Sequence, residues 1–214
     1  MGAKKYDLLE QIPTVENGCI LEIGEGAGEG SSEYLQNLAY SRGMKFISVD
    51  IHPTPKSNID PSNYYSMTGE KFLEEIFPSL GLNIAGAYLD NFDWAWCTHG
   101  EYQTQEWVKQ QNNWYAERKI SFNNLNSSLA HLRQTILLQK YCVDGTLVLF
   151  DDTWVDTEKD VLCGKGNAAI YYMLGTNKWE LVDPLPNSVL DSITRINIEE
   201  YCQGQIHFLL RHKS

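Results

Sequence analysis

The sequence predicts an α/β protein of the doubly wound kind, with a mostly parallel seven-stranded sheet whose last strand is antiparallel. An apolar run at Cys19–Ile23 leads into a loop with glycine at alternate positions from 24 to 30, and a helical pattern follows from Ser31. A buried parallel strand that feeds a glycine turn and a helix is typical of doubly wound cofactor sites. Strand-like apolar runs then alternate with helical patterns, which indicates a sheet covered by helices on both faces.

The expected elements follow one another along the whole chain. Strands are expected at 19–23, 46–50, 64–67, 84–90, 146–151, 179–182 and 206–210, and helices at 4–11, 31–41, 70–77, 124–141 and 167–174. No helical pattern separates the last two strand patterns, so they predict an antiparallel hairpin. No repeat or linker divides the chain, and its 214 residues predict a single domain, 1–214.

One segment, 91–130, is longer than a crossover between two strands needs. Tryptophans at 94, 96, 107 and 114 gather in it, together with many glutamines and asparagines. We expect a lid or substrate-binding insertion whose aromatic side chains shape an acceptor pocket. The alternative is an extra helix that packs these side chains on the edge of the domain.

The glycine loop favours a cofactor without phosphate groups. Glutamates at 22, 25, 29 and 33 crowd the turn, and no Lys or Arg occurs from residue 6 to residue 40. These carboxylates would repel a pyrophosphate at the helix N-terminus by roughly 1 kcal/mol or more per close pair. They favour instead the ammonium and sulfonium groups of S-adenosylmethionine. We therefore expect Glu22, Gly24, Gly26 and Gly28 to bind S-adenosylmethionine, with NAD as the alternative.

An acid also ends the second expected strand. Asp50 stands where a carboxylate can accept hydrogen bonds from both hydroxyls of a cofactor ribose. The alternative is a carboxylate that only caps a turn or a helix. This position cannot by itself separate S-adenosylmethionine from NAD.

Two segments resemble motifs of the class I S-adenosylmethionine-dependent methyltransferases. The run 20–28 (ILEIGEGAG) is similar to their first motif and the run 46–53 (FISVDIHP) to their second, and the likeness spans about residues 18–211. The resemblance implies a Rossmann-like methyltransferase fold and transfer of a methyl group. By position in that pattern, it also implies cofactor contacts for Ile51, Met67 and Thr68. An ordinary turn with Thr68 capping a helix is the alternative there.

Aspartates follow two further strands, at Asp90 and at Asp151 and Asp152. Asp90 is also expected to contact the cofactor. If these strands are neighbours, the three carboxylates converge beside the cofactor, because ligands bind beyond the carboxyl ends of the strands in open α/β sheets. They would repel one another unless a cation sat among them or one held a proton. Mg²⁺ suits such oxygen ligands. The alternative is that these acids cap a helix or bind the cofactor without metal.

This pattern resembles the metal-dependent O-methyltransferases of the catechol and macrocin types. The resemblance implies that Asp90, Asp151 and Asp152 bind a metal ion. In those families the third residue after the first ligand is often the general base, a Lys or His, and here that position is Asp93. His99 is the other candidate base. Lys165, in a glycine-rich turn, could close over the site, although a solvent-exposed loop lysine is the more common outcome.

The expected function is metal-assisted methylation of a hydroxyl oxygen on a small molecule. Catechol, flavonoid, sugar and peptide acceptors all remain open. Two alternatives are an NAD(P)-dependent oxidoreductase on a Rossmann fold and a noncatalytic scaffold that binds the cofactor.

Composition restricts the partners and the compartment. A net charge of −11 argues against general affinity for nucleic acid or an anionic membrane, so neither partner is expected. The five cysteines form no C-x-x-C pair, which is typical of reduced intracellular thiols. No apolar signal region opens the sequence and no run could span a bilayer, so we expect a cytoplasmic protein. A homo-oligomer remains open.

Overall fold

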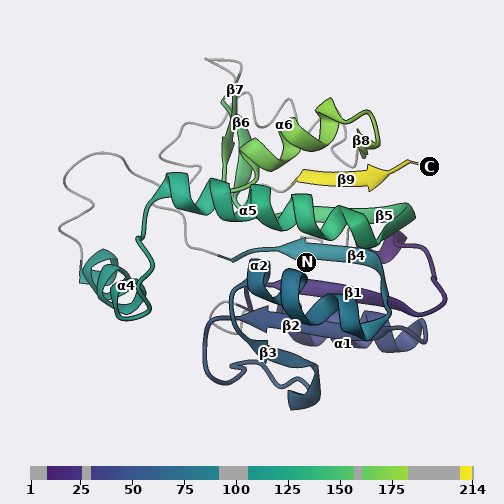
Figure 1. Cartoon of the computed structure of the whole chain (residues 1–214), viewed down its shortest axis with the longest axis horizontal. Coiled ribbons are helices and arrows are strands. Elements are labelled where there is room, and N and C mark those ends of the chain that lie inside the picture. The colour runs from purple at the N-terminus through teal and green to yellow at the C-terminus, as the bar shows by residue number, and fades with distance from the viewer. Residues whose placement is uncertain (1–8, 26–29, 92–105, 157–160, 183–207, 214) are drawn as a thin grey trace, which may run out of the picture.

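The structure is a computed structural model that describes residues 9–25, 30–91, 106–156, 161–182 and 208–213 (Figure 1). Its centre is a seven-stranded sheet in the order β3-β2-β1-β4-β5-β9-β8. These strands are β1 (Gly18–Ile23), β2 (Lys45–Asp50), β3 (Tyr64–Ser66), β4 (Asn83–Leu89), β5 (Cys142–Phe150), β8 (Trp179–Leu181) and β9 (Phe208–His212). Strands β1 to β5 pair in parallel, and β9 is antiparallel to β5 and to β8. The predicted doubly wound sheet with a reversed last strand is confirmed.

Most helices lie close to where the periodicity predicts them. The exceptions are the 3₁₀ turn at 61–63, which was not predicted, and the helix at 106–117, which lies in the segment where an extra helix was the alternative. They are α1 (Ser31–Ser41), η2 (Pro61–Asn63), α2 (Gly69–Lys71), η3 (Phe72–Ile76), α3 (Phe77–Leu80), α4 (Glu106–Glu117), α5 (Asn124–Leu138), η5 (Gln139–Tyr141) and α6 (Asn167–Gly175). Segments α2, η3 and α3 form one continuous helical stretch where a single helix is predicted. Of the helix predicted at 4–11, the structure describes only residues 9–11, which form a short 3₁₀ turn. No helix in the described ranges is long and apolar enough to cross a membrane.

Two hydrophobic cores cover the two faces of the sheet. Leu21 and Ile23 of β1 face a core that includes side chains of η3, α5 and α6. Ile20, the residue before Leu21, faces the other core with Leu35 of α1. Every residue of β1 is buried, as expected of a central parallel strand. Figure 1 shows α5 and α6 on one side of the sheet and α1 on the other.

The chain changes direction of winding between β1 and β4. Strands β2 and β3 lie on one side of β1, and β4 and β5 lie on the other. Beyond β1, Gly24 continues the ladder by donating from its N–H to Val49 O at 2.8 Å, and Asp90 N donates to Ile23 O at 2.9 Å. Doubly wound proteins bind their ligands at this kind of switch point.

Glycine is required at position 24 for two reasons. Its φ is +95°, in the left-handed region that disfavours side chains. A Cβ on Gly24 would also lie 2.3 Å from the backbone nitrogen of Asn91. The loops after β1 and β4 can therefore pass this close only with glycine here.

A two-stranded hairpin that the sequence did not predict follows β5. It consists of β6 (Thr153–Asp156) and β7 (Val161–Gly164), and its register places Thr153 opposite Gly164. The residues just outside this pair are Asp152 and Lys165, and Lys165 N donates to Asp152 O at 2.9 Å. The hairpin therefore returns the chain to the carboxyl end of β5.

Candidate cofactor site

A cavity of about 830 Å³ opens at the carboxyl ends of the parallel strands, against α4 and α5. Six residues that the sequence predicts to bind the cofactor line it: Gly24, Asp50, Ile51, Met67, Thr68 and Asp90. These residues come from the ends of β1, β2, β3 and β4. Gly26, Gly28, Asp93 and His99 lie outside the described residues.

Asp50 has a structural task in addition to its place in the cavity wall. Its Oδ2 accepts a hydrogen bond from Glu25 N and its Oδ1 accepts one from His52 N, both at 2.9 Å. Asp50 therefore does cap a turn, as the alternative to ribose binding expected. A carboxylate has about four lone-pair sites, so two backbone donors leave room for two ribose hydroxyls.

Glu22 does not line the cavity. It is fully buried in β1 and accepts hydrogen bonds from Ser31 Oγ at 2.8 Å and Ser48 Oγ at 3.0 Å. Burial raises the pKa of Glu22 to about 7, although the neighbouring serine hydroxyls lower it in part. The structure thus places this carboxyl inside the fold, where it ties β1 to β2 and α1.

Thr68 and Gly69 shape the wall where the third strand ends. Thr68 Oγ1 accepts a hydrogen bond from Lys71 N at 3.3 Å and so caps α2, as the ordinary-turn alternative expects. A Cβ on Gly69 would lie 2.5 Å from Ile23 Cγ2. The close approach of α2 to β1 brings Met67 and Thr68 to the cavity surface.

Helix α4 adds an aromatic wall. The Trp114 and His52 rings have centroids 4.5 Å apart, and the Arg118 guanidinium lies 3.9 Å from the Trp114 ring centroid. Trp114 and Tyr115 both line the cavity. Burial lowers the pKa of His52, which favours the neutral imidazole beside the indole. Within the predicted insertion 91–130, the described part therefore borders the cavity.

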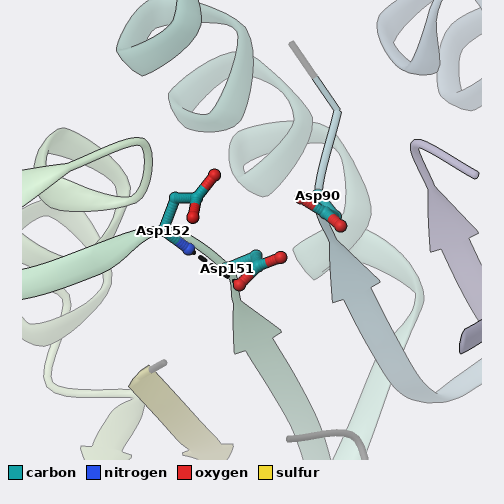
Figure 2. A group of neighbouring side chains, drawn as sticks. All are labelled: Asp90, Asp151 and Asp152. Carbon is teal, nitrogen blue, oxygen red and sulfur yellow. Dashed lines mark hydrogen bonds between the residues drawn. The ribbon is translucent and has the colours of Figure 1, made fainter. Parts of the chain in front are cut away.

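The three aspartates predicted at neighbouring strand ends lie together at one side of this cavity. Asp90 follows β4, and Asp151 and Asp152 follow β5 (Figure 2). One oxygen from each carboxylate lies within 4.8 Å of the other two. The Tyr88 hydroxyl lies 2.8 Å from Asp151 Oδ2 and 3.1 Å from Asp90 Oδ2. Burial and these two carboxylates raise the pKa of Tyr88, so its hydroxyl keeps its hydrogen.

A lysine ammonium lies between two of these carboxylates. Lys165 Nζ is 2.9 Å from Asp90 Oδ1 and 2.8 Å from Asp152 Oδ2. Lys165 is 3% exposed, so the expectation of a solvent-exposed loop lysine is wrong. Burial alone would lower the pKa of Lys165, but the three aspartates outweigh burial and hold this pKa well above its usual value.

The sequence did carry a weak signal for this lysine. Short β-rich runs, Thr-Trp-Val and Val-Leu-Cys, flank the segment between Asp152 and Lys165. Their pairing as β6 and β7 depends on a turn that no Asn-Gly or Asp-Gly dipeptide marks. The glycines on either side of Lys165 suggested a flexible turn instead.

Taken together, these observations define an open α/β protein with a cavity at its switch point, where doubly wound proteins bind their ligands. The chain resembles a protein from Streptococcus mutans assigned as a methyltransferase and solved with S-adenosylhomocysteine. The TM-score is 0.55 and the identity 11%, over 99% of each chain. A protein from Clostridium thermocellum assigned as an rRNA methylase gives a TM-score of 0.55 and 10% identity, over 97% of this chain and 94% of the other.

An rRNA methylase from Streptococcus thermophilus gives a TM-score of 0.51 and 11% identity, over 98% of this chain and 95% of the other. No protein-family model matches the sequence, and no curated protein matches it. These likenesses show that the chain has the Rossmann-like fold of class I S-adenosylmethionine-dependent methyltransferases. The expected fold resemblance is confirmed, whereas none of these neighbours shows the resemblance to the metal-dependent O-methyltransferases.

Proposed function

We propose that this protein is an S-adenosylmethionine-dependent methyltransferase that acts on a hydroxyl of a small molecule. The observation that carries the proposal is the position of Asp50. Its carboxylate faces the switch-point cavity in a fold shared with a protein that binds S-adenosylhomocysteine. The other glutamates of this segment, at 25, 29 and 33, disfavour a pyrophosphate, which supports the same cofactor and argues against NAD.

Different residues of the cavity would bind different parts of the cofactor. Asp50 would accept hydrogen bonds from the ribose, and Ile51 and Met67 offer apolar surface beside it for the adenine. When bound, S-adenosylmethionine supplies a methyl group made electrophilic by the adjacent sulfonium. The chain's own contribution is alignment of the two reactants, which is worth about 7–11 kcal/mol in well-oriented systems.

The acceptor would lie against the aromatic wall. Trp114 and Tyr115 provide large apolar surfaces, while Gln111 and Asn126 add polar groups to the same cavity. This mixture suits a small, partly aromatic acceptor that bears hydroxyl groups. The net charge of −11 supports a small molecule over RNA, although two of the similar structures are described as rRNA methylases.

The described residues include the candidate ligands of the metal ion but neither Asp93 nor His99, the candidate general bases. Asp93 and His99 remain predictions, because both lie outside the described residues. Lys165 is no candidate base, since its high pKa keeps it protonated. For the metal ion, the three aspartates supply suitable oxygens, but Lys165 already engages two of them. We therefore propose methyl transfer without a metal ion.

A binding experiment tests the cofactor. Isothermal titration with S-adenosylhomocysteine should show saturable binding, and NAD should show none. Asp50→Asn should weaken S-adenosylhomocysteine binding about 10- to 100-fold, the effect of losing a hydrogen bond to a charged group. Asp60→Asn is a matched control, because Asp60 also accepts a backbone N–H in a turn but is exposed and outside the cavity. Tight NAD binding without a response to S-adenosylhomocysteine would overturn the proposal.

An activity assay tests the acceptor. Labelled methyl transfer from S-adenosylmethionine should appear with a panel of catechols, flavonoids and sugars, and should be absent with rRNA fragments. Transfer to rRNA alone would refute the small-molecule acceptor and keep the methyltransferase. Cofactor binding with no transfer to a panel that includes whole-cell extract would favour a noncatalytic scaffold.

A further inference from the structure

We propose that Lys165 is a built-in counter-ion that takes the place of a divalent metal ion among Asp90, Asp151 and Asp152. This inference deepens the proposed function and rests on it for its meaning in methyl transfer. The geometry itself does not depend on any cofactor. Lys165 would be a positioning residue that ties the ends of β4 and β5 together at the cavity wall.

The first support is that protein donors already engage the oxygens a metal ion would use. Lys165 Nζ contacts Asp90 Oδ1 and Asp152 Oδ2, the Tyr88 hydroxyl contacts Asp90 Oδ2 and Asp151 Oδ2, and Asp152 N donates to Asp151 Oδ1 at 2.9 Å. Five of the six carboxylate oxygens thus lie within hydrogen-bond distance of a protein donor, and the single hydrogen of the Tyr88 hydroxyl serves one of its two carboxylates at a time. Mg²⁺ requires near-octahedral oxygens at about 2.0–2.1 Å, and it would have to displace the ammonium to reach two of them.

The second support is electrostatic. Three carboxylates so close together repel one another unless a positive charge lies among them. The sequence did not show which group supplies this charge, and in the structure the buried Lys165 ammonium does. A buried cation is tolerated only when it is paired and hydrogen-bonded, and the ammonium has two carboxylate partners and lies 3.4 Å from Asp90 O. Lys165 and the aspartates therefore satisfy one another.

The third support is that the backbone fixes Lys165 on both sides. Before it, the β6–β7 register holds Gly164 opposite Thr153. After it, Gly166 N donates to Thr153 Oγ1 at 3.0 Å, and a Cβ on Gly166 would lie 2.9 Å from the Phe150 ring. A lysine held in this way would leave the aspartates only at the cost of rearranging the hairpin.

Metal binding, measured without any substrate, tests the proposal. Mn²⁺ is the probe, followed by electron paramagnetic resonance and by isothermal titration up to millimolar concentration. The wild-type protein should show no saturable site. Lys165→Ala should gain one Mn²⁺ site, and the further change Asp152→Asn should weaken that site at least 10-fold. Lys109→Ala is the control, because Lys109 pairs with Glu106 at 3.9 Å on the exposed surface of α4 and should gain no site.

Several outcomes separate the possibilities. A saturable wild-type Mn²⁺ site that Asp152→Asn removes would overturn the proposal, and so would a folded Lys165→Ala protein that gains no site. Should Lys165→Ala fail to fold alone, recovery of its circular dichroism spectrum on adding Mn²⁺ is the expected result. The wild-type measurement needs no variant, so it can refute the proposal by itself.

The same samples distinguish this inference from the proposed function. Wild-type protein that binds both S-adenosylhomocysteine and Mn²⁺ would overturn only the role of Lys165. Wild-type protein that binds neither would overturn only the methyltransferase assignment. Methyl transfer that is unchanged by a chelator, together with Mn²⁺-dependent recovery of transfer in Lys165→Ala, would support both.

Discussion

Glu22 is an ionisable group in a buried parallel strand, where it accepts hydrogen bonds from serine hydroxyls. Its pKa is about 7 in the folded protein, against 4.5 for an ordinary glutamate. Between these two values the native state binds a proton that the unfolded chain has released. This group therefore makes the protein less stable as pH rises from about 4.5 to about 7, with no further change above that.

Glu22→Gln should remove this pH dependence. A glutamine has nearly the same shape, and a serine hydroxyl can rotate to accept its amide hydrogen. The variant should match the wild type near pH 4 and exceed its free energy of unfolding by about 3 kcal/mol at pH 8. Urea unfolding of both proteins at several pH values measures the difference between their free energies of unfolding. The contributions of the other ionisable groups are nearly the same in both proteins and largely cancel. A difference that stays constant with pH would contradict the raised pKa.

Gly24→Ala tests the contact between the loops after β1 and β4. The substitution meets a left-handed φ and the backbone of Asn91 at 2.3 Å, so it should cost at least about 2 kcal/mol of stability. Gly43→Ala is the matched control, because Gly43 has a φ of +67° and open space around its Cβ position. It should cost only about 1 kcal/mol, the backbone strain alone. Equal losses in the two variants would refute the close approach.

Among single residues, the sequence predicts best those at the end of a strand or directly after it. Gly24, Asp50 and Asp90 line the cavity because the ends of parallel strands share one edge of the sheet. Lys165 escaped prediction because its position depends on a pairing between two short strands rather than on its neighbours in sequence. Glu22 was misplaced because strand periodicity turns it away from the edge, toward α1.

Elements with strong periodicity could be predicted from the sequence, and elements held by tertiary contacts could not. Helix α1 has the predicted bounds, Ser31–Ser41, and the seven sheet strands lie within a few residues of the predicted ranges. Helix α4 is absent from the expected helices, because an extra helix was only the alternative for its segment. Its Trp114 packs on His52 and on Tyr115. The hairpin was missed because its two four-residue strands are joined by a turn that no Asn-Gly or Asp-Gly dipeptide marks.

Trp114→Ala tests whether α4 forms the acceptor wall. It removes the ring that contacts His52 and Arg118. The acceptor KM should rise about 10-fold, in keeping with an aromatic contact of up to about 1.5 kcal/mol, while S-adenosylhomocysteine binding changes by less than about 3-fold. Steady-state kinetics and titration give the two numbers. A loss confined to cofactor binding would assign α4 to the cofactor instead.

For the whole molecule, charge distribution and topology lead to different conclusions. The fold is shared with proteins described as rRNA methylases, and a fold alone does not fix a substrate. The net charge of −11 is a property of this chain. Because nucleic-acid affinity depends mainly on cations that neutralise phosphates, overall charge should decide general RNA binding.

Weak RNA binding is therefore expected. In fluorescence anisotropy at 150 mM salt, a labelled rRNA fragment should bind with a Kd weaker than about 100 µM, the weak limit of non-specific binding. Acetylated bovine serum albumin provides an acidic reference protein. Submicromolar binding that steepens at low salt would point to a local basic surface and reopen RNA as the acceptor.

The place of β9 in the sheet has a consequence for synthesis of the protein on the ribosome. Residues 208–212 come late in the chain, yet they form an interior strand between β5 and β8. Until they emerge, the flank of β5 stays unpaired, and a nascent polypeptide would expose a hydrophobic strand edge of the kind that chaperones cover.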